Sequence, residues 1–172
     1  MDTFFEQIVA LRKNGKTFAA VAGIWLAAIF ICGALFLFFR YIGAFFILLI
    51  AGVIYGAVKL SGLLNVEYEY IVTNGTLDID KITNKSSRKR VLTLELQTVS
   101  RIEKYNPAQL KSVNPKEVVI ACDKDGKDAY LMVSSTEGKG TNYLVFAPDE
   151  RLRGAIVKFV PKFIANSAFK DE

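Results

Sequence analysis

Hydrophobic and polar residues follow three different patterns in three successive stretches of this chain. Residues 18–39 hold no charged side chain, and a second apolar run covers residues 42–58. From residue 66 onward, polar and apolar side chains alternate with period two, which is typical of β-strands with one buried face. After residue 148, apolar side chains recur every three to four positions, as on an amphipathic helix. The pattern predicts two apolar helices, then a set of strands, then one helix.

Each apolar run is long enough to cross a membrane. About 20 helical residues span a hydrocarbon core of about 30 Å. The second run extends to residue 63 if the Lys59 side chain reaches the interface. One continuous helix through both runs would be about twice as long as a bilayer needs. We therefore predict a transmembrane hairpin over residues 17–64, with spans at about 18–39 and 42–63.

Basic residues at the ends of the spans predict the orientation of this hairpin. Arg12, Lys13 and Lys16 precede the first span and Lys59 closes the second, whereas the turn between them carries only Arg40. The excess of Lys and Arg on one side predicts that both termini lie in the cytoplasm. Neither span contains an acidic residue, so the sequence offers no support for an ion or proton pathway.

Small residues are frequent in both spans, and Gly52 and Gly56 form a GxxxG motif. Such a motif lets two helix backbones approach closely. The partner helix can be the other helix of the same hairpin, or a helix of a second copy in a homo-oligomer. The sequence leaves both alternatives open and predicts a helix-packing role for the two glycines.

The first 16 residues also contain a helical signature. Thr3 and Glu6 have the spacing of a capping box, and one helical face carries Phe4, Phe5, Ile8 and Leu11. We expect a short amphipathic helix over residues 1–16 that lies in the membrane interface. The alternative is a terminus without regular structure.

Residues 65–172 read as one cytoplasmic α+β domain. Strands are predicted near residues 66–73, 76–80, 89–96, 99–105, 117–123, 127–134 and 142–147. Asn74-Gly75 is the preferred dipeptide of a type I′ hairpin turn. The C-terminal helix covers about residues 149–164, and Pro161 should kink it or end it early.

Composition excludes several classes of function. The chain has 172 residues, a net charge of +5, two cysteines and no histidine. Five of its 22 Lys and Arg residues precede residue 65, which leaves 17 in the remainder against 15 acidic residues; this balance does not favour nucleic-acid binding. The lack of histidine removes the commonest general base. Neither cysteine has a second Cys or a His near it, so no metal site and no cofactor are predicted.

The residues of the soluble part resemble a known family. The stretch YEYIVTNGTLDIDKITNKSSRKRVLTLELQTVSRIEKY, with Val99 and Ile102 in a V-x-x-I pattern, is similar to the first half of bacterial pleckstrin-homology-like (PH-like) domains. The resemblance covers about residues 66–165. The opening MDTFFEQIV also resembles bacterial membrane proteins that place a PH-like domain after two transmembrane helices. The resemblance implies an antiparallel β-barrel or sandwich capped by a C-terminal helix, and a role in association.

One segment of the soluble part concentrates positive charge. It lies in the expected loop between the second and third strands of that part, and its residues are Lys81, Lys85, Arg88, Lys89 and Arg90. One interpretation is contact with anionic lipid headgroups or with a partner. The alternative is a solvated loop whose charges protect a sheet edge from aggregation.

These observations lead to one functional hypothesis and one alternative. The hypothesis is a non-catalytic, multi-pass protein of the bacterial inner membrane whose cytoplasm-facing module binds a protein partner or the inner-leaflet lipids. The alternative is a structural subunit of a membrane oligomer that assembles through its small transmembrane residues. An enzyme would need chemistry from Lys, Asp, Tyr or Ser alone, and a buried cluster with shifted pKa values would revive that idea.

Overall fold

The computed structural model describes residues 3–123, 128–136 and 140–169, which fall into two compact units. The helical unit comprises residues 12–66 together with residues 83–87. The sandwich unit comprises residues 1–11, 67–82 and 88–172. Residues 1–11 therefore belong to the same unit as the strands that follow the helices in the sequence.

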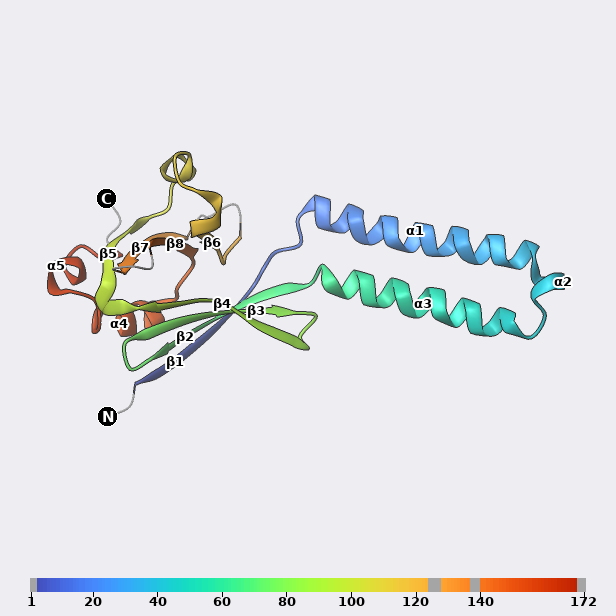
Figure 1. The fold of residues 1–172 in the computed structure, drawn as a ribbon, viewed down its shortest axis with the longest axis horizontal. Coiled ribbons are helices and arrows are strands. Elements are labelled where there is room, and N and C mark those ends of the chain that lie inside the picture. Colours follow the sequence, from blue (N-terminus) through green and yellow to red (C-terminus); the bar gives the residue numbers. More distant parts are fainter. Residues whose placement is uncertain (1–2, 124–127, 137–139, 170–172) are drawn as a thin grey trace. The chain divides into compact units, whose positions relative to one another are not determined.

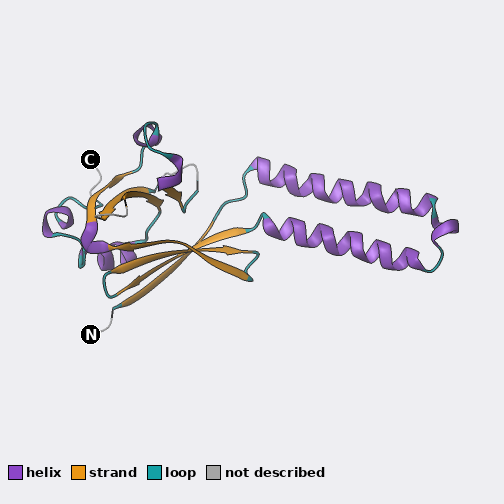
Figure 2. Cartoon of the chain, viewed as in Figure 1, coloured by secondary structure: helices purple, strands orange, loops and turns teal. Residues whose placement is uncertain are grey.

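The helical unit is an antiparallel hairpin (Figures 1 and 2). Its helices are α1 (Gly15–Leu37), α2 (Phe39–Ile42) and α3 (Phe45–Leu63). Helix α1 begins where the Asn14 side chain accepts a hydrogen bond from the Thr17 backbone N–H at 2.9 Å, which is an N-cap. Ala28 of α1 and Ala57 of α3 are the buried side chains of these two helices. Small side chains at these points allow the two long helices to lie close together.

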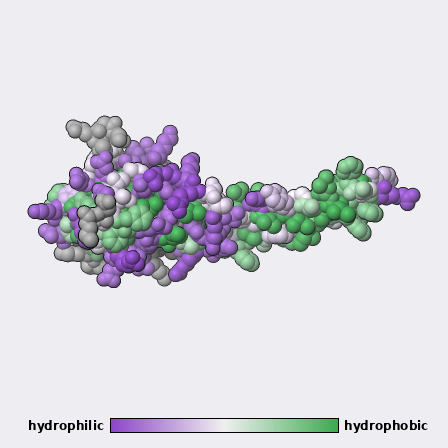
Figure 3. All heavy atoms as spheres, turned by 90° about the horizontal axis from the view of Figure 1, so that it is seen from below, coloured by the Kyte–Doolittle hydropathy of each residue, from purple (hydrophilic) through white to green (hydrophobic). Residues whose placement is uncertain are grey.

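The surface of this hairpin is apolar. Both long helices have the length and composition needed to cross a membrane, and only 6% of the most apolar window of each is buried. Large side chains such as Phe30, Leu37 and Ile47 are more than three-quarters exposed. Figure 3 shows this hydrophobic surface along the helices and a largely hydrophilic surface over the strands. A helix from the core of a soluble domain would instead bury most of such residues.

The sandwich unit consists of two four-stranded sheets. The first sheet has the order β1-β2-β3-β4, with strands Phe4–Ala10, Val66–Thr73, Thr76–Thr83 and Ser87–Glu95. The second has the order β5-β7-β8-β6, with strands Val99–Lys104, Tyr130–Thr136, Gly140–Phe146 and Val118–Ile120. Strand β6 runs parallel to β8, whereas β7 is antiparallel to both of its neighbours. Short 3₁₀ turns lie at Leu96–Thr98, Pro107–Leu110 and Pro115–Glu117. The predicted α+β fold is confirmed, as a sandwich and not a closed barrel.

Strand β1 corrects the expectation of an amphipathic helix over residues 1–16. Residues Phe4–Ala10 pair antiparallel with β2, from Phe4 opposite Thr73 to Ala10 opposite Glu67. Phe5 and Val9 pack against the core of the sandwich. Thr3 bonds to Asn74 at the end of the ladder and does not cap a helix. The segment alternates inward and outward along a strand, and pairing with residues some 60 positions later outweighs its helical spacing.

The main core lies between the two sheets and under the C-terminal helices. Its fully buried large side chains include Tyr70, Phe146, Leu77, Ile79, Leu96, Met132, Leu144, Leu152 and Ile156. Helix α4 (Glu150–Val157) begins at Asp149, whose side chain accepts from the Leu152 N–H at 2.7 Å. Pro161 separates α4 from α5 (Lys162–Ala165), so the predicted helix ends early, as expected.

The predicted hairpin turn between β2 and β3 is present. Asn74 and Gly75 have φ values of 47° and 90°, and a type I′ turn requires positive φ at both positions. A Cβ atom on Gly75 would lie 3.3 Å from the Phe159 ring. Gly75 therefore serves both the turn and the close approach of the C-terminal segment.

Candidate functional site

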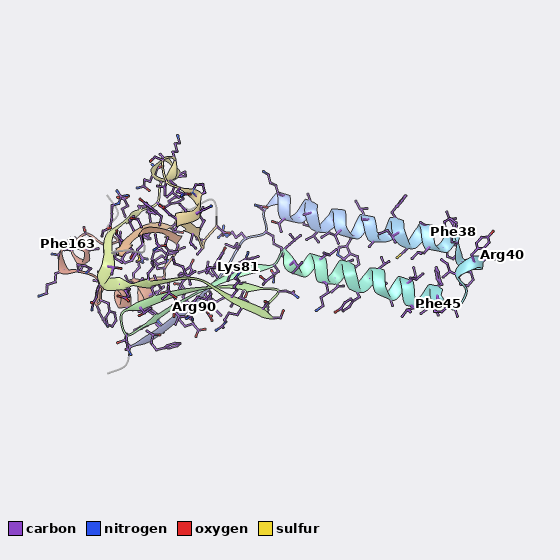
Figure 4. The ribbon with its side chains drawn as sticks, in the orientation of Figure 1. Phe38, Arg40, Phe45, Lys81, Arg90 and Phe163 are labelled. Carbon is purple, nitrogen blue, oxygen red and sulfur yellow. The ribbon has the colours of Figure 1, made fainter. Side chains whose placement is uncertain are left out.

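The structure distributes the five predicted basic residues over three elements. Lys81 lies in β3, Lys85 in the turn that follows, and Arg88, Lys89 and Arg90 in β4. The segment is thus mostly strand, which corrects the expected loop. Figure 4 labels Lys81 and Arg90 on their neighbouring strands. The placement decides which of the five side chains meet acidic partners.

Arg88 is paired with a buried carboxylate. Its guanidinium Nη2 lies 2.9 Å from Oε1 of Glu69 on β2, and the Glu69 side chain is fully buried. Burial raises the pKa of Glu69, a hydrogen bond with the Glu6 carboxyl raises it further, and Arg88 opposes both effects. Arg88 therefore provides the opposite charge for the Glu69 carboxylate, which would otherwise be buried in the sheet without an ion-pair partner.

Arg90 is held by two further carboxylates. Its Nε lies 2.9 Å from Oδ1 of Asp80, and its Nη1 lies 3.0 Å from Oδ2 of Asp78. The Thr93 hydroxyl donates to the other Asp78 oxygen at 2.6 Å. Asp80 is 4% exposed, so this is a second nearly buried carboxylate matched to an arginine. Sequence reasoning missed these acidic partners, although the signal was the opposite charge on neighbouring strands.

A different set of cations lies in the helical unit. Residues 12–66 and 83–87 contain six basic residues and no Asp or Glu. Arg40 is at the hairpin turn, at the same end of the helical unit as Phe38 and Phe45 (Figure 4). The other five are close in sequence to the start of α1 or the end of α3, or lie in the turn after β3, and we call them the basic end: Arg12, Lys13, Lys16, Lys59 and Lys85.

Lys85 joins the basic end because its turn packs on the last residues of α3. The Asn84 backbone N–H donates to the Asn65 carbonyl at 2.8 Å. The Asn84 side chain occupies the space beside Gly62, where an added Cβ would lie 2.7 Å from its carbonyl carbon. Asn84 and Lys85 both have positive φ, at 52° and 54°. Gly62 therefore leaves room for the turn that carries Lys85.

The two glycines of the GxxxG motif face open space. A Cβ atom added to Gly52 or Gly56 would meet no atom within 4 Å, apart from the backbone of its own helix and its chain neighbours. The contact between α1 and α3 involves Ala28 and Ala57 instead. The packing role of the two glycines stays a prediction.

Buried groups with shifted pKa values occur in the sandwich, but the shifts favour their neutral forms. The Tyr70 hydroxyl donates to the Ala121 carbonyl at 2.6 Å, and burial raises its pKa. Burial likewise raises the pKa of Tyr68, and it raises the pKa of the Cys122 thiol to about 11. A nucleophile needs the opposite shift. Among the residues that the structure describes, no group of three or more His, Cys, Asp or Glu could hold a metal ion.

Comparison with protein families gives one match over nearly the whole chain. The matching family is described as "Bacterial PH-like domain (DUF6106)", and its model covers residues 1–166. The match includes β1 and both long helices as well as the sandwich. Comparison with curated proteins and with solved structures gives no significant match.

Proposed function

We infer the function from one premise: the chain belongs to the DUF6106 family of bacterial PH-like domains. Its two apolar helices fit a membrane-anchored PH-like protein. We propose that the hairpin anchors the sandwich on the cytoplasmic side of the inner membrane. There the sandwich acts as a non-catalytic module that binds a protein partner or the inner-leaflet surface.

The observation that carries this proposal is the exposed apolar surface of α1 and α3. Nearly all of each apolar window is exposed, although the same chain buries the large side chains between its sheets. Exposed apolar area costs about 25 cal/mol per Å² in water, so a surface of this kind needs lipid or protein around it. At about 1.5 Å per residue, α1 and α3 are about 35 Å and 29 Å long, which fits a bilayer.

The absence of suitable chemistry supports a non-catalytic role. The sequence contains no histidine, and the buried tyrosine and cysteine groups described above are held in their neutral forms. A binding role needs only a presented surface. The distribution of basic residues supports a cytoplasmic position for both termini. The turn has only Arg40, whereas four basic residues flank the outer ends of the two helices: Arg12, Lys13, Lys16 and Lys59.

Site-directed cysteine labelling tests the anchor and its orientation. The two native cysteines are replaced by Ala, and either Tyr41→Cys in α2 or Ser112→Cys on the sandwich is introduced. A membrane-impermeant maleimide added to intact spheroplasts should label only the first variant, and permeabilisation should expose the second. Labelling of Ser112→Cys from outside would overturn the orientation. Release of the whole chain by alkaline carbonate would overturn the anchor.

Crosslinking in native membranes tests the module. The full chain should co-purify with a defined protein or with inner-leaflet lipids, whereas a chain reduced to residues 12–66 should not retain the protein partner. Identical sets of partners for the two chains would remove the role assigned to the sandwich.

The open face of Gly52 and Gly56 supports a second candidate, a structural subunit of a membrane oligomer. Small residues without a neighbour let a helix of another copy approach closely. Replacing both glycines by Leu should then abolish crosslinked oligomers in membranes. Gly23→Leu on α1, where the added Cβ also meets nothing, is the control. Unchanged crosslinking in the double variant would exclude this candidate.

A further inference from the structure

The helical unit carries a net charge that nothing within it compensates. Its six Lys and Arg side chains face no Asp or Glu in residues 12–66 and 83–87, and five of them form the basic end. In the sandwich, Arg88 and Arg90 of β4 form ion pairs with the carboxylates of Glu69, Asp78 and Asp80. The basic end is therefore the part of the chain where positive charge accumulates.

The side chains of the basic end are accessible to a ligand. Lys13, Lys16, Lys59 and Lys85 are all exposed. Lys59 lies one turn before the end of α3, with its ammonium 5.6 Å from the centre of the Tyr55 ring. An amphipathic tyrosine with a neighbouring lysine at the end of an apolar helix is typical of the level of lipid headgroups.

The docked turn adds a lysine to this group from a distant part of the sequence. Gly62 makes room for Asn84, and the hydrogen bond from Asn84 to Asn65 fixes the turn beside the end of α3. Lys85 is the next residue, and its left-handed backbone is part of that turn. A solvated loop would need no such glycine and no such hydrogen bond.

We propose that the basic end binds the phosphate headgroups of anionic phospholipids in the cytoplasmic leaflet, with Lys85 completing the site formed by Lys13, Lys16 and Lys59. Anionic lipid is the partner because the cations adjoin two helices that fit a bilayer, at the depth where lipid phosphates lie. This inference rests on the proposed membrane anchor and names the ligand that the anchor recruits.

Lipid selectivity of the full chain tests the proposal. The protein is reconstituted in bilayers of phosphatidylcholine with a minor fraction of spin-labelled phosphatidylglycerol or spin-labelled phosphatidylcholine, and the motionally restricted fraction of each label is measured. The full chain should prefer phosphatidylglycerol, and the preference should fall in about 0.5 M salt, where screening is strong. Equal restriction of the two labels would overturn the inference.

Variants assign the effect to the basic end. Lys85→Gln should lower the preference about fivefold, and Lys13→Gln with Lys16→Gln should lower it further, since each cation near an anionic surface contributes a factor of about that size. Lys111→Gln with Lys116→Gln, two exposed lysines of the sandwich, should leave it unchanged. An equal loss in that control would show a general charge effect and would overturn the assignment.

A variant that keeps every charge tests the turn. Gly62→Leu should displace the Asn84 side chain and lower the preference, and an unchanged preference would show that this contact does not position Lys85. Carbonate extraction accompanies each measurement. A chain that is stripped from the bilayer contradicts the proposed anchor, whereas a chain that stays inserted without lipid preference contradicts only this inference.

Discussion

The two units of this protein differ in their charged side chains. The sandwich buries the carboxylates of Glu69 and Asp80 and matches each with an arginine of β4. The helical unit contains cations alone and exposes them at its ends. A carboxylate in a protein interior needs a nearby partner, whereas a cation at a bilayer surface has the lipid phosphates. The contrast in charge is what the proposed membrane anchor and water-exposed sandwich require.

Apolar side chains show the same contrast. Sheets and C-terminal helices of the sandwich close over Tyr70, Phe146 and Ile156, which are fully buried. On α1 and α3 comparable side chains point outward. If this contrast reflects two solvents, substitutions at packed positions should destabilise the sandwich. Substitutions at the exposed apolar positions of the helical unit should have little effect on its stability.

The largest effect should come from separating the units. Because Ala10 and Glu67 are directly opposed in the β1–β2 ladder, their Cα atoms lie about 5 Å apart. Residues 11–66 can therefore be replaced by an Asn-Gly turn. We expect a soluble, cooperatively unfolding sandwich, as measured by circular dichroism and sedimentation. Residues 67–172 without β1 should lose cooperative unfolding, and equal behaviour of the two fragments would refute the assignment of β1 to the sandwich.

The next effect concerns the ion pair between Arg88 and the buried Glu69 carboxylate. Arg88→Met leaves Glu69 buried without its cation, which should lower the free energy of unfolding of the sandwich by about 2 kcal/mol, because Arg88 is itself half-exposed and solvent screens part of the interaction. Lys89→Met, at an exposed neighbouring position, is the control. Urea unfolding followed by tyrosine signals measures both. Similar stability of the two variants would mean that solvent, and not Arg88, compensates Glu69.

Glycine substitutions give a smaller effect that should differ between the units. Gly75→Ala places a side chain at φ 90° against the Phe159 ring and should cost about 1–2 kcal/mol. Gly52→Ala adds a methyl group where no atom lies within 4 Å, so it should leave the thermal stability of the helical unit unchanged or slightly higher. A loss at Gly52 would reveal a neighbour that covers this face.

The smallest effect is a dependence of sandwich stability on pH. Burial and the Glu6 carboxyl raise the pKa of Glu69 above its ordinary value of 4.5, so folding favours the protonated form. The associated stabilisation is complete below pH 4.5 and is lost as pH rises through the folded-state pKa. Glu69→Gln should flatten this part of the curve. If the stability of both the original protein and Glu69→Gln rose with pH in this range, the assigned loss of Glu69 stabilisation at higher pH would be wrong.

Local signals predicted much of the fold. The Asn74-Gly75 turn, the alternation in β2 and the break at Pro161 are each determined within a few residues, and the structure contains all three. The candidate site was less predictable. Five cations in one segment look alike in sequence, but the partners of Arg88 and Arg90 lie on β2 and β3 and become visible only when the strands are paired.

Strand β1 shows why a local pattern can mislead. Phe4, Ile8 and Leu11 have helical spacing, while Phe5, Gln7 and Val9 have strand spacing within the same residues 4–11. Pairing with β2 decides between helix and strand for this segment, and β2 follows the entire helical hairpin in the sequence. Gln7 shows the tertiary bond that favours the strand, since its side chain amide donates to the Ala147 carbonyl at 3.1 Å.

The pairing of β1 with β2 has a consequence for membrane insertion. Backbone hydrogen bonds along Phe4–Ala10 require both strands in one aqueous compartment, because a sheet cannot close through a lipid layer. If α1 and α3 anchor the chain in a membrane as proposed, the segment between β1 and β2 must cross the bilayer an even number of times. With that anchor, a chain inserted through one helix alone would leave Phe4–Ala10 on the opposite side of the membrane from β2, so the first sheet would form only after both helices cross.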